Sequence, residues 1–469
     1  MKIYESIEID KNSDEPLYLQ VYEAIKNLIE NGAFKADEKL PAIRELSKKL
    51  EVNNITIVNA YKLLEQKGYA YSKVGSGTFV RGNKKDDIYI NDDRKVNFSH
   101  IRTPYKVDFS SMNIESELFP VDDFKEVLNE VLDRDRGLAF AYQESQGYYP
   151  LRESIRQYLK DNDIPCDFNN IHVISGAQQG IDIISKSLLS FNDTIVVESP
   201  TYTGAVAAFK SRGASIIEVP IEEDGINIKE LEQVLKSCNP KLIYIMSNYQ
   251  NPTGISYSQS KKLQLLYLAQ KYNTYILEDD YLSELKFYGE KNPSIKAMDA
   301  KERVIYLKSF SKIFMPGIRL AFLITPSYIT KKVTAVKYNT DISTSSLIQR
   351  AFDLYLRKGK WQNHLNKMWS IYKGRYDVLV NNLKYETPFV EFKEPMGGIH
   401  IWAKTDVDSI ILSSLAKEKG LLISPGRIFY MDERDTEYFR ISFACADEEK
   451  IEEAIKILKE SYYDVKNKV

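Results

Sequence analysis

Cysteine and histidine are scarce in this chain of 469 residues, which has three cysteines and four histidines. Cys166, Cys238 and Cys445 stand singly, so their spacing indicates neither a disulfide framework nor a zinc site. We therefore expect a protein of a reducing compartment that binds no metal.

Long hydrophobic runs and a surplus of one charge are missing as well. No apolar run approaches the ~20 residues that a membrane-spanning helix needs, and the start, MKIYESIEID, lacks the apolar segment of a signal peptide. The formal net charge is -2, so no chain-wide basic excess points to nucleic acid. These absences favour a cytoplasmic protein without a membrane partner, in which any DNA-binding surface is local.

The sequence is long enough for two or three domains, and its pattern changes near residue 81. A short helical unit over 1–80 is followed by a polar, charged segment over 81–107 that we interpret as a linker. From residue 108, short runs rich in Ile and Val alternate with helical patterns, which indicates a mostly parallel sheet covered on both faces. The predicted strands are 171–174, 194–199, 215–220, 241–246, 274–279, 304–309 and 319–324. The predicted helices between them include 176–190, 203–212, 228–237 and 258–272.

Three further helices are predicted near the N-terminus, at 16–32, 40–50 and 52–68. Asn53 or Asn54 can cap the third, and Asn54 and Ile55 face outward if Ile57 faces the core. Residues 69–80 then form a hairpin around Gly75 and Gly77. A helix-turn-helix with a hairpin wing predicts a DNA-binding unit, for which the alternative is a small helical docking module.

Local charge and sequence resemblance favour DNA binding. Seven lysines and arginines against three glutamates leave residues 39–80 with +4. The segments LPAIREL, ITIVNAYKLLEQKGY and GSGTFV resemble the winged helix of the GntR family of bacterial regulators. The resemblance implies phosphate contacts for Arg44 and Thr56 and a minor-groove approach at Gly77. It departs at Asn53-Asn54, where the family usually has Ser-Arg, and Asn54 can pair with adenine instead.

In the larger part, several motifs can converge on one ligand. A turn after strand 171–174 offers free backbone N–H groups to a phosphate, and it is formed by Gly176, Ala177 and Gln178. Tyr202 can stack on a flat ring, and the amide of Asn251, fixed before Pro252, can donate to a ring oxygen. Taken singly, these motifs are equally explained by ordinary turns and core packing.

Adjacent acids end the strand at 274–279. Burying Asp279 and Asp280 is costly unless they meet a cation, such as a protonated pyridine nitrogen. A metal site or a salt bridge is the alternative. The spacing to Tyr281, which can donate to a phenolic oxygen of the ring, favours Asp279 over Asp280 as the residue that faces the nitrogen.

The segment SFSKIFMPGIR (309–319) combines an amine with phosphate ligands. Lys312 can form a Schiff base if burial and nearby cations lower its pKa. Ser309 and Ser311 offer hydroxyls, and Arg319 offers a planar fork for phosphate. Arg440, in a predicted strand among apolar neighbours, needs an anion, which is either a ligand carboxylate or a structural ion-pair partner.

The order of these motifs resembles the fold-type I pyridoxal-phosphate enzymes, the class I/II aminotransferases, over about residues 108–469. SELFP, AYQESQGYYPLRESI and EPMGGIHIW add to the resemblance. It implies an α/β fold with a mostly parallel seven-stranded sheet and a smaller α+β subdomain. It also implies pyridoxal 5′-phosphate bound at Lys312, with Asp279 and Tyr281 as the other catalytic residues. Tyr142 would reach the cofactor phosphate of the other subunit of a homodimer.

A winged helix joined to an aminotransferase-like domain is similar to the MocR subfamily of GntR regulators. The combination implies a homodimeric transcription regulator that binds double-stranded operator DNA. Its domain 108–469 would sense pyridoxal 5′-phosphate, or an amino acid or amine effector, through aldimine formation at Lys312. The alternative is a working aminotransferase with a secondary DNA-binding domain, because Lys312, Asp279 and Arg440 form a complete catalytic set.

Overall fold

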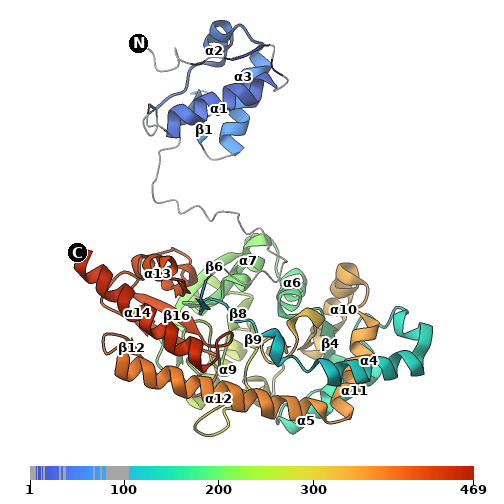
Figure 1. Cartoon of the computed structure of the whole chain (residues 1–469). Helices are drawn as coiled ribbons and strands as arrows, with labels where there is room; N and C mark the ends of the chain where they lie inside the picture. Colours follow the sequence, from blue (N-terminus) through green and yellow to red (C-terminus); the bar gives the residue numbers. More distant parts are fainter. Residues whose placement is uncertain are drawn as a thin grey trace. The chain divides into compact units, whose positions relative to one another are not determined.

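The computed structural model describes residues 7, 9–11, 13, 16–30, 33–34, 38–66, 69–73, 77–80 and 105–468. The chain divides into two compact units, residues 1–101 and 102–469 (Figure 1). Most of the predicted linker and the predicted turn residue Gly75 lie outside the described residues. In the part of the chain that is described, no helix is long and apolar enough to cross a membrane.

The first unit has the predicted order of three helices and a hairpin. Its elements are α1 (Leu17–Glu30), α2 (Ile43–Leu50), α3 (Asn54–Gln66), β1 (Ala70–Lys73) and β2 (Gly77–Val80). The strands pair antiparallel, with Ala70 opposite Val80. Val21 of α1 and Ile57 of α3 are fully buried in one core. The Asn53 side chain accepts a hydrogen bond of 3.0 Å from the backbone N–H of Ile55, which confirms the cap of the third helix.

An eight-stranded sheet forms the centre of the larger unit. Its strands are β4 (Ile171–Ile174), β5 (Thr194–Ser199), β6 (Ser215–Glu222), β7 (Gly225–Ile226), β8 (Leu242–Ile245), β9 (Tyr275–Asp280), β10 (Val304–Ser309) and β11 (Ala321–Ile324). Their order is β4-β11-β10-β9-β8-β5-β6-β7, and β11 and β7 run antiparallel to their neighbours. All seven predicted strands are present. The eighth, β7, escaped prediction because its two residues are too short for any periodicity.

Helices cover both faces of this sheet (Figure 1). They include α5 (Tyr149–Asp161), α6 (Ala177–Leu188), α7 (Thr203–Ser211), α8 (Ile228–Cys238), α9 (Gln259–Lys271) and α10 (Ser327–Asp341). Successive residues of β5 belong to different cores: Ile195 packs in the cluster that contains Phe209 of α7, and Val196 packs in the cluster that contains Leu231 of α8. The alternation explains why the strands are apolar without interruption.

Further helices flank the sheet at its β4 side and along the base of the unit. These are α4 (Val121–Asp135), α11 (Ser346–Arg357) and the long α12 (Lys360–Glu386). Short 3-10 helices connect the elements: η2 (Ser116–Leu118), η3 (Arg136–Phe140), η4 (Phe168–Asn170), η5 (Lys296–Met298), η6 (Pro316–Ile318) and η7 (Gly426–Phe429).

A smaller antiparallel sheet forms the predicted α+β subdomain. Its order is β12-β13-β16-β15, and it packs with two helices. The elements are β12 (Glu391–Phe392), β13 (His400–Lys404), β15 (Ser424–Pro425), β16 (Tyr438–Ser442), α13 (Ser409–Glu418) and α14 (Glu448–Lys468). Two short strands, β3 (Val107–Asp108) and β14 (Leu421–Leu422), pair in parallel beside it.

Truncation of a fully buried leucine of the large sheet tests this architecture. We expect Leu307→Ala on β10 to lower the free energy of unfolding by about 2–5 kcal/mol, because it removes core contacts and leaves a cavity. Leu263→Ala, at a position on α9 that is 51% exposed, is the matched control and should change it by less than about 0.5 kcal/mol. Urea unfolding followed by tryptophan fluorescence reports on this unit alone, since the three tryptophans, Trp361, Trp369 and Trp402, all lie in it. Equal losses in the two variants would contradict the assignment of β10 to the core.

Candidate functional site

A pocket of about 650 Å³ lies at the carboxyl ends of the parallel strands of the larger unit, where open α/β sheets bind ligands. Residues predicted from the sequence line much of it. They are Ala177, Gln178, Tyr202, Asn251, Asp279, Tyr281, Ser309, Ser311, Lys312, Arg319 and Arg440. These predicted residues come from different strands and loops, and the two that are farthest apart in sequence, Ala177 and Arg440, are separated by 263 residues.

Asp279 presents an unpaired carboxylate oxygen at this pocket. Its Oδ2 accepts a hydrogen bond of 2.8 Å from the Tyr244 hydroxyl, and its buried Oδ1 has no partner among the described residues. Burial raises the pKa of Asp279 to about 7. A cation placed against Oδ1 would satisfy it and lower this pKa.

Asp280, the other acid considered from the sequence, belongs to a different network. Its carboxylate accepts hydrogen bonds from Tyr306, at 2.5 Å, and from Lys308, at 3.1 Å. Burial alone would raise the pKa of Asp280, but the Lys308 ammonium holds this pKa below its usual value. Asp280 is therefore neutralised within the protein, and it does not line the pocket.

Gly176 and Arg319 form a close contact at the start of α6. Arg319 donates a hydrogen bond of 3.3 Å from Nη2 to the Ser175 carbonyl. Gly176 has a φ of 90°, and a Cβ atom there would collide with the Arg319 guanidinium. Only glycine combines a favourable positive φ with the absence of a Cβ atom. The hydroxyls of Ser309 and Ser311 lie 3.0 Å apart and line the same pocket, so N–H, O–H and guanidinium donors are available for an anion.

Lys312 follows β10 and lines the pocket between these donors and Arg440 in the small sheet. Burial lowers the pKa of Lys312 to about 8, and the positive charges of Arg440 and Arg319 contribute to the decrease. A substantial fraction of the amine is consequently neutral near pH 8, as a nucleophile requires.

Arg440 is a buried cation without an acidic partner. It donates hydrogen bonds to Asn251 Oδ1 at 2.7 Å, to the Ser110 carbonyl at 2.7 Å and to the Ser424 hydroxyl at 3.3 Å. No carboxylate lies within ion-pair distance of it among the described residues, and its Nε is unpaired. Burial lowers the pKa of Arg440 to about 10. The structural ion pair considered from the sequence is absent from this part of the chain, so the guanidinium is available to a ligand anion.

The two predicted tyrosines lie in different surroundings. Tyr281 lines the pocket, but its hydroxyl donates to the Tyr249 carbonyl at 2.6 Å, so its proton is already used. Tyr142 is 80% exposed and does not line the pocket of its own chain. Its predicted contact with a second subunit stays a prediction.

Sequence reasoning missed several residues of the pocket. Ser110 and Ser424 stand outside any motif. Tyr244, which does not line the pocket but donates a hydrogen bond to Asp279, lies inside a strand that reads as uniformly apolar. A further set lies in the segment 423–429, in the short β15 and η7. No periodic pattern marks these positions; only the contacts with Asp279 and Arg440 reveal them.

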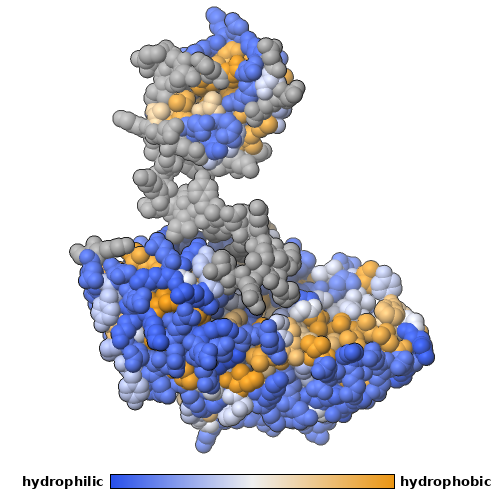
Figure 2. Space-filling view, viewed as in Figure 1, coloured by the Kyte–Doolittle hydropathy of each residue, from blue (hydrophilic) through white to orange (hydrophobic). Residues whose placement is uncertain are grey.

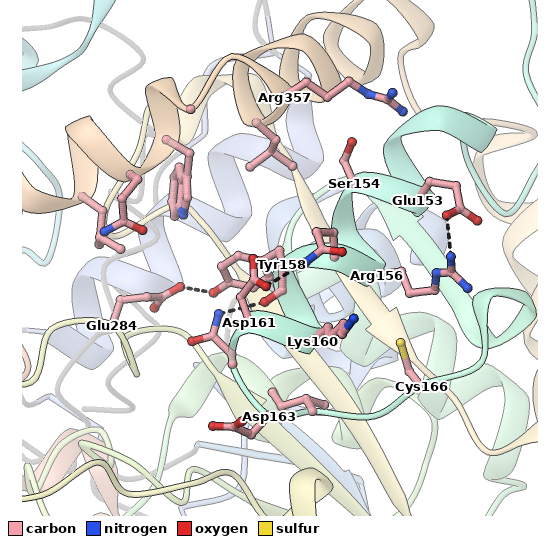
Figure 3. A pocket seen from close by; sticks show the side chains of 18 of the residues that line it. Glu153, Ser154, Arg156, Tyr158, Lys160, Asp161, Asp163, Cys166, Glu284 and Arg357 are labelled. Atoms are coloured by element: carbon pink, nitrogen blue, oxygen red, sulfur yellow. Dashed lines mark hydrogen bonds and ion pairs between the residues drawn. The ribbon is translucent and has the colours of Figure 1, made fainter.

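A larger cleft of about 1090 Å³ lies beside α5 and the start of α12 (Figure 3). Several of its polar side chains pair with one another: Tyr158 donates to Glu284 at 2.5 Å and Arg156 donates to Glu153 at 2.9 Å. Burial raises the pKa of the Cys166 thiol to about 11, which keeps it protonated. This cleft shares no lining residue with the first pocket.

The predicted DNA-binding residues of the first unit lie at its surface. Arg44, Asn53, Asn54 and Gly77 are exposed, and Thr56 is half-buried. The Asn54 Oδ1 accepts a hydrogen bond of 2.5 Å from Ser47, which fixes its amide at the start of α3. Their contacts with DNA stay predictions.

Comparisons with known proteins decide the family. Residues 107–458 match the family "Aminotransferase class I and II", and residues 17–80 match "Bacterial regulatory proteins, gntR family". The probable rhizopine catabolism regulatory protein MocR of Rhizobium meliloti is 26% identical over 473 residues, which cover 97% of this chain and 95% of that protein. The chain belongs to the aminotransferase class I and II family and to the MocR subfamily of GntR regulators.

Enzymes match the larger part of this MocR-subfamily chain. Aromatic-amino-acid aminotransferase 1 of Thermococcus litoralis is 32% identical over 354 residues, which are 74% of this chain and 85% of the enzyme. The crystal structure of Pyrococcus horikoshii kynurenine aminotransferase in complex with PMP has a TM-score of 0.74 and 29% identity. It covers 81% of this chain and 98% of its own. The winged helix and the aminotransferase fold predicted from the motifs are thereby confirmed.

Membership in this family implies pyridoxal 5′-phosphate as the cofactor. The pocket fits that group in three respects. The unpaired oxygen of Asp279 suits a pyridinium nitrogen, the donors around Gly176 and Arg319 suit a phosphate, and Lys312 has the lowered pKa that a covalent link requires.

Gly176→Ala should weaken cofactor binding at least about tenfold, since the added methyl group displaces Arg319 and strains a backbone of positive φ. Gly317→Ala is the control: it lies in the same loop as Arg319, but a Cβ there meets nothing within 4 Å. Fluorescence titration of the apoprotein with pyridoxal 5′-phosphate gives both affinities. If both variants bind like the wild type, the phosphate does not lie at Gly176.

Proposed function

We propose that this protein is a homodimeric transcription regulator with three parts. Residues 1–80 bind double-stranded operator DNA, residues 81–107 act as the linker, and residues 108–469 bind pyridoxal 5′-phosphate and sense an amino acid or amine. The proposal is carried by the buried Arg440, which lines the same pocket as Lys312 and has no acidic partner among the described residues. A regulator of transcription works where the chromosome is, which agrees with the cytoplasmic location predicted from the sequence.

In this proposal, Lys312 holds the cofactor covalently, and Asp279 balances the charge of its ring nitrogen. Ser309, Ser311 and Arg319 bind the phosphate. When bound, pyridoxal 5′-phosphate supplies an electrophilic carbon for amines and an electron sink. Lys312, with its pKa of about 8, is the residue that exchanges places with the amine of an effector and takes up or releases the proton.

The effector carboxylate would bind Arg440. Two of the guanidinium nitrogens already bind neutral oxygens, of Asn251 and Ser110, so the guanidinium is oriented before a ligand arrives. Asn251 Oδ1 faces the arginine, which leaves the amide nitrogen of Asn251 to donate to the cofactor ring. Binding of the carboxylate and release of Lys312 change the charge of the pocket together, and this change is the proposed signal.

Dimerisation is supported by large apolar residues at the surface after α4. Leu138 and Phe140 in η3 are 67% and 70% exposed, and Tyr142 follows at 80%. A band of hydrophobic residues is visible near α4 on the face of the larger unit drawn in Figure 2. Contiguous apolar surface of this kind is typical of an interface with another protein. A second copy would bury Tyr142 and bring it within reach of a neighbouring pocket, as the family resemblance implies.

Footprinting of the DNA upstream of the gene tests the regulator function. We expect salt-sensitive protection, and Arg44→Ala should reduce the slope of log affinity against log salt by about 1, because one phosphate contact is lost. Lys26→Ala is the matched control, since the Lys26 charge is paired with Glu23 at 3.0 Å on α1. Absence of protection at low salt would exclude DNA binding as the function.

The same pocket supports the second candidate function, an aminotransferase, because it holds Lys312, Asp279 and Arg440 together. With the cofactor-loaded protein, an amino acid and a keto acid, we expect ligand-dependent changes in the footprint and little steady turnover. Lys312→Ala should lose the borohydride-trapped cofactor found by mass spectrometry, and its footprint should no longer respond to amines. Sustained turnover with a footprint that ignores every amine would favour the enzyme instead.

A further inference from the structure

Part of the wall of the 650 Å³ pocket is apolar, and it is concentrated in one segment. The apolar lip, as we call residues 423–429, contributes Ile423, Pro425, Ile428 and Phe429 to the pocket. Met112 lines it as well. Neither the cofactor nor the carboxylate of an effector uses these side chains, so they are free to contact the remainder of the effector.

The charged residues of the pocket restrict the charge that the effector side chain can carry. Its charged lining residues are Asp279, Lys312, Arg319 and Arg440. The proposed function assigns three of them to the cofactor and Arg440 to one carboxylate. Among the described residues that line the pocket, no second cation remains for a distal carboxylate and no anion remains for a distal amine. A charged effector side chain placed against the apolar lip would therefore lose part of its hydration without gaining an ion-pair partner from the described wall, which is unfavourable.

The apolar lip is held in place from both sides. Ser424 lies opposite Arg440 in the pairing of β15 with β16, and the Phe429 carbonyl accepts a hydrogen bond of 3.0 Å from the Thr201 N–H. A side chain at Gly426 would collide with the Tyr438 carbonyl, so the lip packs directly on the backbone of β16. The Phe429 ring lies 5.0 Å from the Arg440 guanidinium. The position of the apolar surface relative to the carboxylate-binding group is thus fixed by the fold.

Ile428 is the residue that core packing does not explain. It lines the pocket but is 48% exposed, although the neighbouring Phe429 is only 4% exposed. Exposure of a large apolar side chain at the mouth of a polar site is unfavourable in water and is relieved when an apolar ligand covers it.

We propose that the effector is a primary amine with a single carboxylate and an apolar side chain, which packs against Ile428 and the rest of the apolar lip. The inference rests on the proposed function, because it takes Arg440 as the carboxylate site. It excludes acidic amino acids and diamines as strong effectors. Ile428 is then a specificity-determining residue.

Carboxylates that lack an amine measure this selectivity without any reaction. The probes are 3-phenylpropanoate and glutarate, titrated by calorimetry into the cofactor-loaded full-length protein. We expect 3-phenylpropanoate to bind at least about tenfold more tightly than glutarate, since unpaired buried charge is penalised more than a missing apolar contact. Ile428→Arg should reverse the order by supplying a cation for the second carboxylate. Ile411→Arg, at a position on α13 that is 50% exposed and outside the pocket, is the matched control and should leave the order unchanged.

The outcomes separate this inference from the proposed function. If glutarate binds the wild type as tightly as 3-phenylpropanoate and both are lost in Arg440→Ala, the carboxylate site stands and the inference about the side chain is wrong. An unchanged preference in Ile428→Arg would also overturn it. If neither probe binds, or if Arg440→Ala has no effect on either, the proposed carboxylate site fails and the inference fails with it.

Discussion

The alternation of side chains at the ends of β9 and β10 is the constraint on which the pocket depends. On one face, Asp280 and Lys308 neutralise each other, and Lys308 also binds Glu284 at 2.6 Å. On the other face, the adjacent residues of the two strands, Asp279 and Ser309, line the pocket. Because successive residues point to opposite faces, a saturated ionic network and an unsaturated binding site sit back to back.

This separation explains how a buried acid stays available. An isolated carboxylate in the interior would otherwise be protonated or paired, and the pKa of about 7 for Asp279 shows how close it is to protonation. Asp280 already has the nearest cation, so Asp279 cannot recruit it. A buried carboxylate oxygen without a partner, such as Oδ1 of Asp279, is unfavourable for folding and is unusual outside functional sites.

Much of the fold follows from the sequence because most strands are apolar without interruption, and because side chains such as Asn227 and Ser258 cap the helices α8 and α9 between them. The order of the motifs along the chain also predicts correctly that Lys312, Asp279 and Asn251 share one pocket. The proton of Tyr281 could not be assigned in this way, since its acceptor is the backbone carbonyl of Tyr249, 32 residues away. The apolar lip could not be predicted either, because Ile423 lies outside any helix or strand and the other residues lie in β15 and η7, which are too short to have a periodicity.

Residues 107–110, which follow the proposed linker, are hydrogen-bonded to β14 and to Arg440 of the small sheet. Val107 and Phe109 donate backbone hydrogen bonds to Gly420 and Leu422, and the Ser110 carbonyl accepts from Arg440. The segment that follows the proposed linker and the arginine proposed to bind a carboxylate therefore share a hydrogen bond. In the proposed function, an anion that draws on the donors of Arg440 would compete with the Ser110 carbonyl and so act on the anchorage of the segment that follows the proposed linker.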